Sequence, residues 1–192
     1  MLDGEFFSLW KDWYPDAPPL GFVLREMYPD LWLRIPGLPR GKRYAETDDE
    51  RAELNRRHNA AATEVLRHNA DCTLVLFAPC AADASDVRSA AGFNADTTMQ
   101  LLGQLERRWQ DEYFAEAMCF HGTRVTWTPG GSDGFIDAVG DGKARGLIVE
   151  MALGRVYAPF AGGADLFFAT PRERDAAAER FAHWRADPPD GA

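Results

Sequence analysis

The sequence predicts a single α+β domain over residues 1–192, with an antiparallel sheet of about five or six strands and helices packed mainly on one face. Two observations predict this fold. Segments with apolar residues at helical spacing occur in the first half of the chain and at its end. Short strand-like segments separated by turn-forming residues fill most of the second half, which is typical of an antiparallel meander. Such helices and strands must bury each other's apolar sides, so we expect one layered core.

The composition supports a folded chain. Hydrophobic residues make up 46% of the sequence and aromatic residues 12%. A chain of this size buries roughly 70% of the surface that its unfolded form exposes, so a sizeable core is expected. Apolar residues at helical spacing predict a first helix over residues 2–13, which Pro15 ends. A second short helix is expected after Pro18 and Pro19, and residues 31–36 alternate like a strand.

The middle of the chain begins with a strong helix signal. Thr47 and Glu50 have the spacing of a capping box, in which each side chain bonds to a backbone N–H at the start of a helix. We expect this helix to reach about His68. The continuous apolar run at 73–79 then predicts a buried strand.

Two segments follow that strand. Residues 81–95 are rich in Ala, Asp, Ser and Gly, which predicts a long or mobile connection. Residues 97–117 are expected to form a third long helix. Its apolar side would carry Leu101, Leu102, Leu105, Trp109 and Tyr113.

The predicted meander follows as five strand-like pieces at 120–127, 134–139, 144–151, 155–160 and 164–169. Between the last two, Gly162 and Gly163 predict a hairpin turn, because glycine reaches positive φ without steric cost. Thr170 and Glu173 repeat the capping-box spacing and start the final helix. Its docking side would carry Ala177, Phe181 and Trp184, and the tail at 187–192 is expected to be flexible.

The charge balance restricts the class of partner. A formal net charge of −9 disfavours binding to nucleic acid or to an anionic membrane surface, because both depend on Lys and Arg. A basic protein partner would be attracted instead. No apolar run is long enough to span a membrane, and the first residues lack the basic start of a signal peptide. We therefore expect a cytoplasmic protein.

The three cysteines are expected to be reduced and buried. Cys72 and Cys80 stand at the two ends of one predicted strand, which separates them beyond the reach of a disulfide. Cys119 and His121 point to the same side of another predicted strand, so they resemble half of a zinc site or a Cys/His catalytic pair. No matching second pair exists, so we expect two buried side chains, no metal and no cofactor.

A basic loop stands out in this acidic chain. Residues 37–44, GLPRGKRY, end in Gly-Lys-Arg-Tyr but lack the spacing and the Ser or Thr of a nucleotide-binding phosphate loop. The alternatives are a solvated loop and a contact for an anion or a partner, where an Arg fork would bind a carboxylate or a phosphate. The residues that would form this contact are Arg34, Arg40, Lys42 and Arg43, with Tyr44 and Glu46 close enough to take part.

The remaining candidates have structural explanations beside functional ones. His58 lies on the apolar side of its helix, where a core histidine is more common than a catalytic base. Aspartates in the predicted meander could converge on a metal or act as general acid and base, whereas Asp beside Gly more often forms turns. These are Asp133, Asp137, Asp141 and Asp165. Within residues 156–184, the turn and helix signals explain nearly every residue except Asp165.

Two stretches carry a family resemblance. LRIPGLPRGKRYAETDDERAELNRRHN and RVYAPFAGGADLFFATPRERDAAAERFAHW resemble segments of a family of small uncharacterised bacterial proteins. That family is characterised by an LP..KRY loop, a helix with Arg-His-Asn and a P[FY].GG.D hairpin before a helix with Trp. It has no established activity. The resemblance implies that the positions to test are Lys42, Arg43, Tyr44, Arg57, His58, Asn59 and Asp165. Ala161 stands where an acidic residue is expected, which argues against a metal at the hairpin.

The sequence thus predicts a small acidic, non-enzymatic protein-binding module. One version is an immunity-type antagonist of a basic toxin. The alternative is a hydrolase or transferase that uses His58 or His121 with Asp165 near the basic loop. This alternative requires those side chains to surround one pocket.

Overall fold

The computed structural model describes residues 3–185. The helices in this range are α1 (Asp3–Trp13), α2 (Gly21–Met27), α3 (Asp48–Leu66), α4 (Ala84–Ala90), α5 (Arg107–Tyr113), α6 (Asp133–Gly140), α7 (Pro171–Arg180) and α8 (Ala182–Arg185). The strands are β1 (Trp32–Pro36), β2 (Asp71–Pro79), β3 (Gln100–Gln104), β4 (Met118–Thr126), β5 (Gly146–Glu150), β6 (Arg155–Phe160) and β7 (Gly163–Phe167). Residue 2 of the first predicted helix and the tail expected to be flexible lie outside the described residues.

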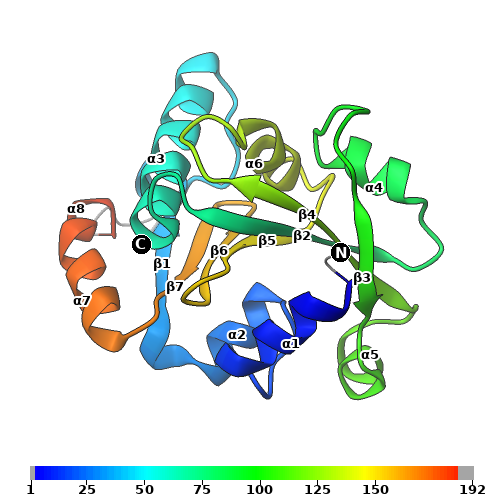
Figure 1. Cartoon of the computed structure of the whole chain (residues 1–192). Helices are drawn as coiled ribbons and strands as arrows, with labels where there is room; N and C mark the ends of the chain where they lie inside the picture. The colour runs from blue at the N-terminus through cyan, green and yellow to red at the C-terminus, as the bar shows by residue number, and fades with distance from the viewer. Residues whose placement is uncertain (1–2, 186–192) are drawn as a thin grey trace.

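The strands form one antiparallel sheet in the order β1-β7-β6-β5-β2-β4-β3 (Figure 1). The predicted α+β class is confirmed. The sheet has seven strands, more than the five or six expected. Strands β5, β6 and β7 form the consecutive hairpins of the expected meander. The N-terminal strand β1 pairs with β7, the last strand of the chain.

Helices cover both faces of the sheet, whereas the sequence predicted mainly one (Figure 1). One core joins α3, α4, α6, α7 and α8 to side chains such as Leu74 and Ile148. The other joins α1 and α2 to side chains such as Val75 and Val149. Neighbouring residues of β2 and β5 thus belong to opposite cores. A continuous apolar run suits a strand buried on both sides, and this explains the difference.

The connection between β2 and β4 differs most from prediction. Residues 81–95 include α4, whose Val87 packs into the core. Residues 97–117 do not form one helix but hold β3 and α5. In β3, Leu102 is buried and Leu101 is 56% exposed, which is the alternation of a strand. Leu102 packs against Gly122 of β4, where an added Cβ would lie 2.6 Å from it.

One predicted strand is a helix. Residues 134–139 belong to α6. The buried residues of α6 are Phe135, Ile136, Ala138 and Val139, which is the spacing of one helical side. This apolar side packs into the core with α3. In so short a segment, the apolar run alone did not separate helix from strand.

Both predicted helix starts are confirmed. The Thr47 Oγ1 accepts a hydrogen bond from the Glu50 backbone N–H, and Thr170 Oγ1 accepts one from that of Glu173, each at 3.2 Å. The two glutamate side chains make further bonds. The Glu50 carboxylate accepts from the Glu46 backbone N–H and from Lys42, and the Glu173 carboxylate accepts from Arg155. The start of α3 is therefore tied to the loop that precedes it, and the start of α7 to β6.

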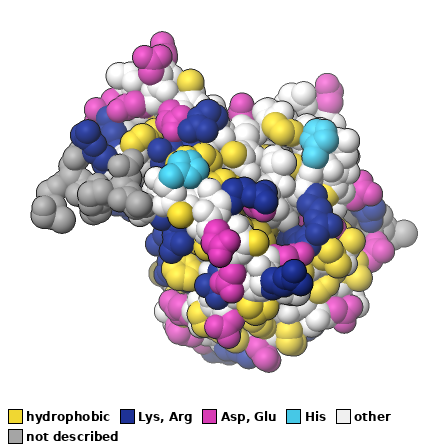
Figure 2. Space-filling model, turned by 90° about the vertical axis from the view of Figure 1, so that its left-hand side faces the viewer, with side chains coloured by type: hydrophobic (Ala, Val, Ile, Leu, Met, Phe, Trp, Pro, Cys, Tyr) yellow, Lys and Arg dark blue, Asp and Glu magenta, His cyan; other side chains and the backbone are white. Residues whose placement is uncertain are grey.

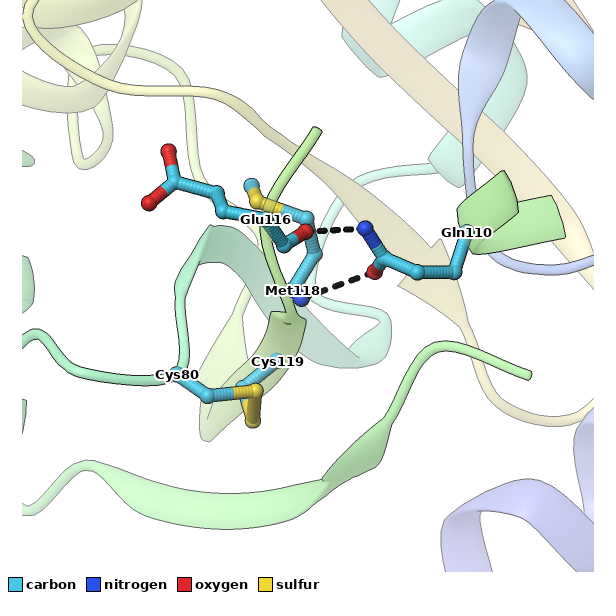
Figure 3. The surroundings of a disulfide bond; sticks show 5 residues. All are labelled: Cys80, Gln110, Glu116, Met118 and Cys119. Atoms are coloured by element: carbon cyan, nitrogen blue, oxygen red, sulfur yellow. Dashed lines mark hydrogen bonds between the residues drawn. A yellow bond between two sulfur atoms is a disulfide. The ribbon is translucent and has the colours of Figure 1, made fainter. Parts of the chain in front are cut away.

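A disulfide joins Cys80 and Cys119, so the expectation that all cysteines are reduced is wrong (Figure 3). The two residues lie on paired segments at the ends of β2 and β4, a proximity that depends on strand pairing. Cys72 is buried and unpaired. Beside the bridge, the Gln110 side-chain amide donates to the Glu116 carbonyl and accepts from the Met118 N–H (Figure 3). These bonds hold α5 at the start of β4.

No helix in the described part of the chain is long and apolar enough to cross a membrane.

Candidate functional site

The β6–β7 hairpin and β1 place Asp165 at the centre of the candidate site. The predicted turn is confirmed: Gly162 has φ 107°, in the region that favours glycine. An added Cβ on Gly163 would lie 2.2 Å from the carbonyl oxygen of Ile35, so this position must be small. The hairpin therefore fits closely against β1, and Asp165 lies opposite Arg34.

Asp165 is 4% exposed and binds three side chains. Its Oδ1 accepts from Trp32 Nε1 at 2.7 Å and from Arg34 Nε at 2.8 Å, and its Oδ2 accepts from Arg34 Nη2 at 2.8 Å. Arg25 Nη1 lies 4.0 Å from Oδ2. Two parallel bonds fix the plane of a guanidinium, so Asp165 orients Arg34.

Two aromatic rings also pack against the same guanidinium. The Cζ of Arg34 lies 4.5 Å from the centroid of the Phe160 ring and 5.5 Å from that of Trp32. Stacking on a ring face stabilises a guanidinium without using its N–H donors. The Arg34 side chain remains 42% exposed, so its remaining N–H groups are available to a ligand.

A pocket of about 650 Å³ opens over this cluster. Four arginines line it, Arg25, Arg34, Arg43 and Arg145, against a single acidic residue, Asp165, so the formal charge of the lining is +3. The apolar part of the lining includes Phe22, Phe77, Leu147 and Phe160. This is a marked excess of positive charge in a chain with a net charge of −9. A pocket of this size fits a small molecule.

Two of these arginines have no carboxylate as an ion-pair partner. Within residues 3–185, neither Arg43 nor Arg145 forms an ion pair or a side-chain hydrogen bond, and both are exposed. Arg43 lies against the hairpin turn, because an added Cβ on Gly162 would lie 3.1 Å from its Cγ. Guanidinium groups bind anionic oxygens through two parallel donors. The arrangement is therefore suited to binding a carboxylate or a phosphate.

The rest of the basic loop points elsewhere. The Lys42 Nζ donates to Glu50 at 2.7 Å and to Glu46 at 3.0 Å. The hydrogen bond to Glu50, followed by the one to Glu46, raises the pKa of Lys42. Tyr44 is 54% exposed and lines none of the pockets around Asp165. The loop thus contributes Arg43 to the site, while Lys42 ties the loop to α3.

Arg57 and Asn59 have structural partners on α3 and α6. The buried Arg57 donates to Glu53 at 2.7 Å and lies over the Trp184 ring, 5.2 Å from its centroid. Asn59 donates to Asp133 at 2.7 Å, which connects α3 to α6. The structure therefore separates both residues from Asp165.

His58 lies on the other side of the sheet from Asp165. It is 4% exposed, and its Nδ1 lies 2.6 Å from the Tyr157 hydroxyl. Tyr157 pairs with Leu166 and shares the α3 core, whereas Asp165 pairs with Ala158, whose side chain belongs to the α1/α2 core. Burial lowers the pKa of His58 to about 4, so the ring is neutral at pH 7. The structure does not bring His58 and Asp165 into one pocket.

Because the pKa of His58 is lowered by folding, we expect the protein to lose stability in mild acid. Its pKa is about 6.5 when unfolded and about 4 when folded, so the unfolded chain binds an extra proton between these values. Stability from this group is complete above pH 6.5 and falls towards pH 4, by about 3 kcal/mol in all. We expect urea unfolding from pH 7 to pH 4 to show this loss in the wild type. His58→Gln should lack it, and the control His183→Gln, on an exposed histidine, should keep it. Equal pH slopes in wild type and His58→Gln would contradict the assignment.

The other candidate chemistry is not assembled either. His121 is 5% exposed, and neither ring nitrogen has a hydrogen-bond partner in the described chain. Burial lowers the pKa of His121. Cys119, its neighbour on the same side of β4, is bonded to Cys80 rather than to a metal or a histidine. Among residues 3–185 no group of three or more His, Cys, Asp or Glu side chains is placed to hold a metal ion.

The three other aspartates belong to α6 and its end, not to hairpin turns as expected. Asp133 accepts from Asn59, and Asp137 and Asp141 pair with Arg51 at 3.1 and 3.3 Å. Each therefore has a structural partner on α3. The aspartates do not converge with Asp165.

Arg25 and Arg145 are the site residues that the sequence did not identify. Arg25 lies at the end of α2, and Arg145 immediately precedes β5. Nothing in their local sequence distinguishes them from solvated arginines. They reach the pocket because α2 begins against β6, where an added Cβ on Gly21 would lie 2.8 Å from the Ala158 Cβ, and because β5 begins next to the end of β2.

Comparison with known proteins identifies a family but no activity. Residues 20–189 match the family model described as "Domain of unknown function (DUF3885)". No curated protein and no solved structure matches the chain significantly. The matched range contains the whole sheet and every residue of the arginine-lined pocket except Pro19.

Proposed function

We propose that this chain, which belongs to the DUF3885 family, is a non-enzymatic binding protein for a small ligand with phosphate or carboxylate groups. The observation that carries the proposal is the lining of the pocket, where four arginines face one carboxylate. Guanidinium groups gathered in one concave site repel each other unless an anion neutralises them. An anionic ligand would supply that charge.

Asp165 supports binding through its effect on Arg34. The buried carboxylate accepts two bonds from Arg34 and one from Trp32, so the guanidinium is held in one orientation before any ligand arrives. A preorganised donor loses less conformational entropy on binding than a mobile side chain. Arg43 and Arg145 would add charge from two other segments of the lining.

The same pocket offers little for catalysis. Its ionisable lining residues are the four arginines and Asp165, with no His, Cys, Lys or Glu among them. A general base needs a lone pair within reach of the substrate, and the carboxylate oxygens of Asp165 already accept bonds from Arg34 and Trp32. We therefore favour binding over the hydrolase or transferase alternative.

The immunity-type role and the cytoplasmic location stay predictions. A basic toxin would need an acidic surface, whereas this site has the opposite charge. Disulfides are rare in the cytosol, so the redox state of Cys80 and Cys119 in cells would test the location.

Calorimetric titration with inorganic pyrophosphate, and separately with citrate, tests the proposal. We expect saturable binding of at least one probe, weakened as salt rises. Arg43→Gln should lower its affinity about tenfold, because the variant loses one charge-assisted contact. Arg107→Gln is the matched control, since this 92% exposed side chain on α5 is not among the residues that line the pocket. Absence of saturable binding, or equal losses in both variants, would overturn the proposal.

A further inference from the structure

A second cavity adjoins the arginine-lined pocket. It measures about 780 Å³ and shares four wall residues with the first cavity, Arg34, Arg43, Phe160 and Ala161. The hairpin turn and β1 form this common wall. The two cavities are therefore neighbours that meet at Arg34 and Phe160.

The positive charge continues into the second cavity. Arg174 of α7 and Arg185 of α8 line it, and no acidic residue is among its lining residues. Counted together, the two cavities have six arginines and one aspartate, a formal charge of +5. Figure 2 views the side of the molecule that carries β1, α7 and α8, and several Lys and Arg side chains lie there among hydrophobic ones.

We infer that the two cavities form one groove for an elongated ligand with a phosphate group at each end. This inference rests on the proposed function and specifies its ligand class. One end would bind near Arg145 in the first cavity, and the other near Arg174 in the second. Arg43 faces both cavities and would lie beside the middle of the ligand.

The shared wall favours one long ligand over two separate anions. The wall that both cavities share holds the ring of Phe160 beside the guanidinium groups of Arg34 and Arg43, so the linking segment of one ligand can pack on the ring while its polar groups accept from the arginines. Two separate anions would each lose translational freedom, whereas a linked pair loses it once. Linear molecules with a phosphate group at each end have this design.

Matched synthetic probes test the groove directly. Alkanediol bisphosphates of increasing chain length are titrated calorimetrically beside alkyl monophosphates of the same length. We expect one bisphosphate per chain and, at the best length, an affinity at least about tenfold above that of the matched monophosphate. A matching α,ω-dicarboxylate series shows whether carboxylates serve as well as phosphates. Weaker binding of the dicarboxylates is expected, and tighter binding would overturn the assignment of phosphate ends.

Variants in the second cavity separate this inference from the proposed function. Arg174→Gln should abolish the higher affinity of the bisphosphate over the matched monophosphate. It should leave the affinity of the monophosphate for the first cavity unchanged. Arg107→Gln should retain the gain, and circular dichroism checks that each variant is folded. If monophosphates bind but bisphosphates gain nothing, or if Arg174→Gln leaves the gain intact, the single groove is overturned and the binding function stands. If none of the alkyl monophosphates and bisphosphates binds, the groove is overturned. The separate titrations with pyrophosphate and citrate then test the proposed function.

Discussion

Replacing Cys80 and Cys119 together by alanine is expected to lower the free energy of unfolding by about 4 kcal/mol. The disulfide closes a loop with a sequence separation of 39 residues, and a loop of this size restricts the unfolded chain by roughly that amount. For a chain of this length, the loss corresponds to a fall in melting temperature of about 10 °C. Alanine suits these positions because Cys119 is buried and a new hydroxyl there would need a partner.

Calorimetry with and without reductant measures this effect. Adding reductant to the wild type should lower its melting temperature to that of the double variant, and the double variant should not respond. Cys72 takes no part, because it is unpaired in both proteins. An unchanged melting temperature in the double variant would show that the bridge does not stabilise the fold.

Replacing Glu173 by alanine is expected to cost about 3 to 4 kcal/mol of stability. Arg155 on β6 is 3% exposed, and its Nε and Nη2 donate to the Glu173 carboxylate on α7. Its Nη1 has no partner in the described chain. Without Glu173, the buried guanidinium would lose the carboxylate to which it is hydrogen-bonded, which is among the costliest single changes in a protein. The side chain of Glu173 is 34% exposed, so water reduces the loss to the lower part of the usual range.

Two further variants show whether the loss of stability in Glu173→Ala comes from the unpaired Arg155. Glu179→Ala removes an exposed carboxylate from the same helix and should change the unfolding free energy by less than about 0.5 kcal/mol. Adding Arg155→Met to Glu173→Ala removes the unpaired charge and should recover most of the loss, because an apolar side chain fits a buried site. If the double variant is no more stable than Glu173→Ala, the cost comes from α7 itself.

The sequence correctly predicted those helix starts and turns that depend on contacts between residues close in sequence. Thr47 and Thr170 mark the starts of α3 and α7 because a side-chain oxygen satisfies a backbone N–H three residues later. Gly162 marks the hairpin because the turn requires positive φ. In each case the decisive contact lies within a few residues.

The wrong predictions concern segments whose structure is determined by strand pairing. The leucines and aromatic residues of 97–117 fit a helical pattern, yet residues 100–104 pair with β4 as an edge strand. The space beside Gly122, which Leu102 fills, is created by a segment about twenty residues away in sequence and is invisible locally. The disulfide was missed for the same reason, since it depends on the β2–β4 register.

The site was predicted in part, for a related reason. Asp165 drew attention because no turn explained it, and the structure makes it the partner of Arg34. Arg43 was identified through the basic loop. Arg25 and Arg145 were not, because only the packing of α2 and the start of β5 bring them to the pocket. Conversely, His58 and Arg57 have structural partners in the core instead of facing a ligand.

The pairing of β1 with β7 determines when the pocket comes into existence. Arg34 and Asp165 are 131 residues apart in sequence, and β1 lies at the sheet edge with β7 as its neighbour. During synthesis the N-terminal part of a chain leaves the ribosome first. The nascent β1 therefore has no strand partner, and Trp32 and Arg34 have no Asp165, until residues 163–167 have emerged. The arginine-lined pocket is thus complete only after β7 has been made, and a product that ends before β7 would lack Asp165, which orients Arg34.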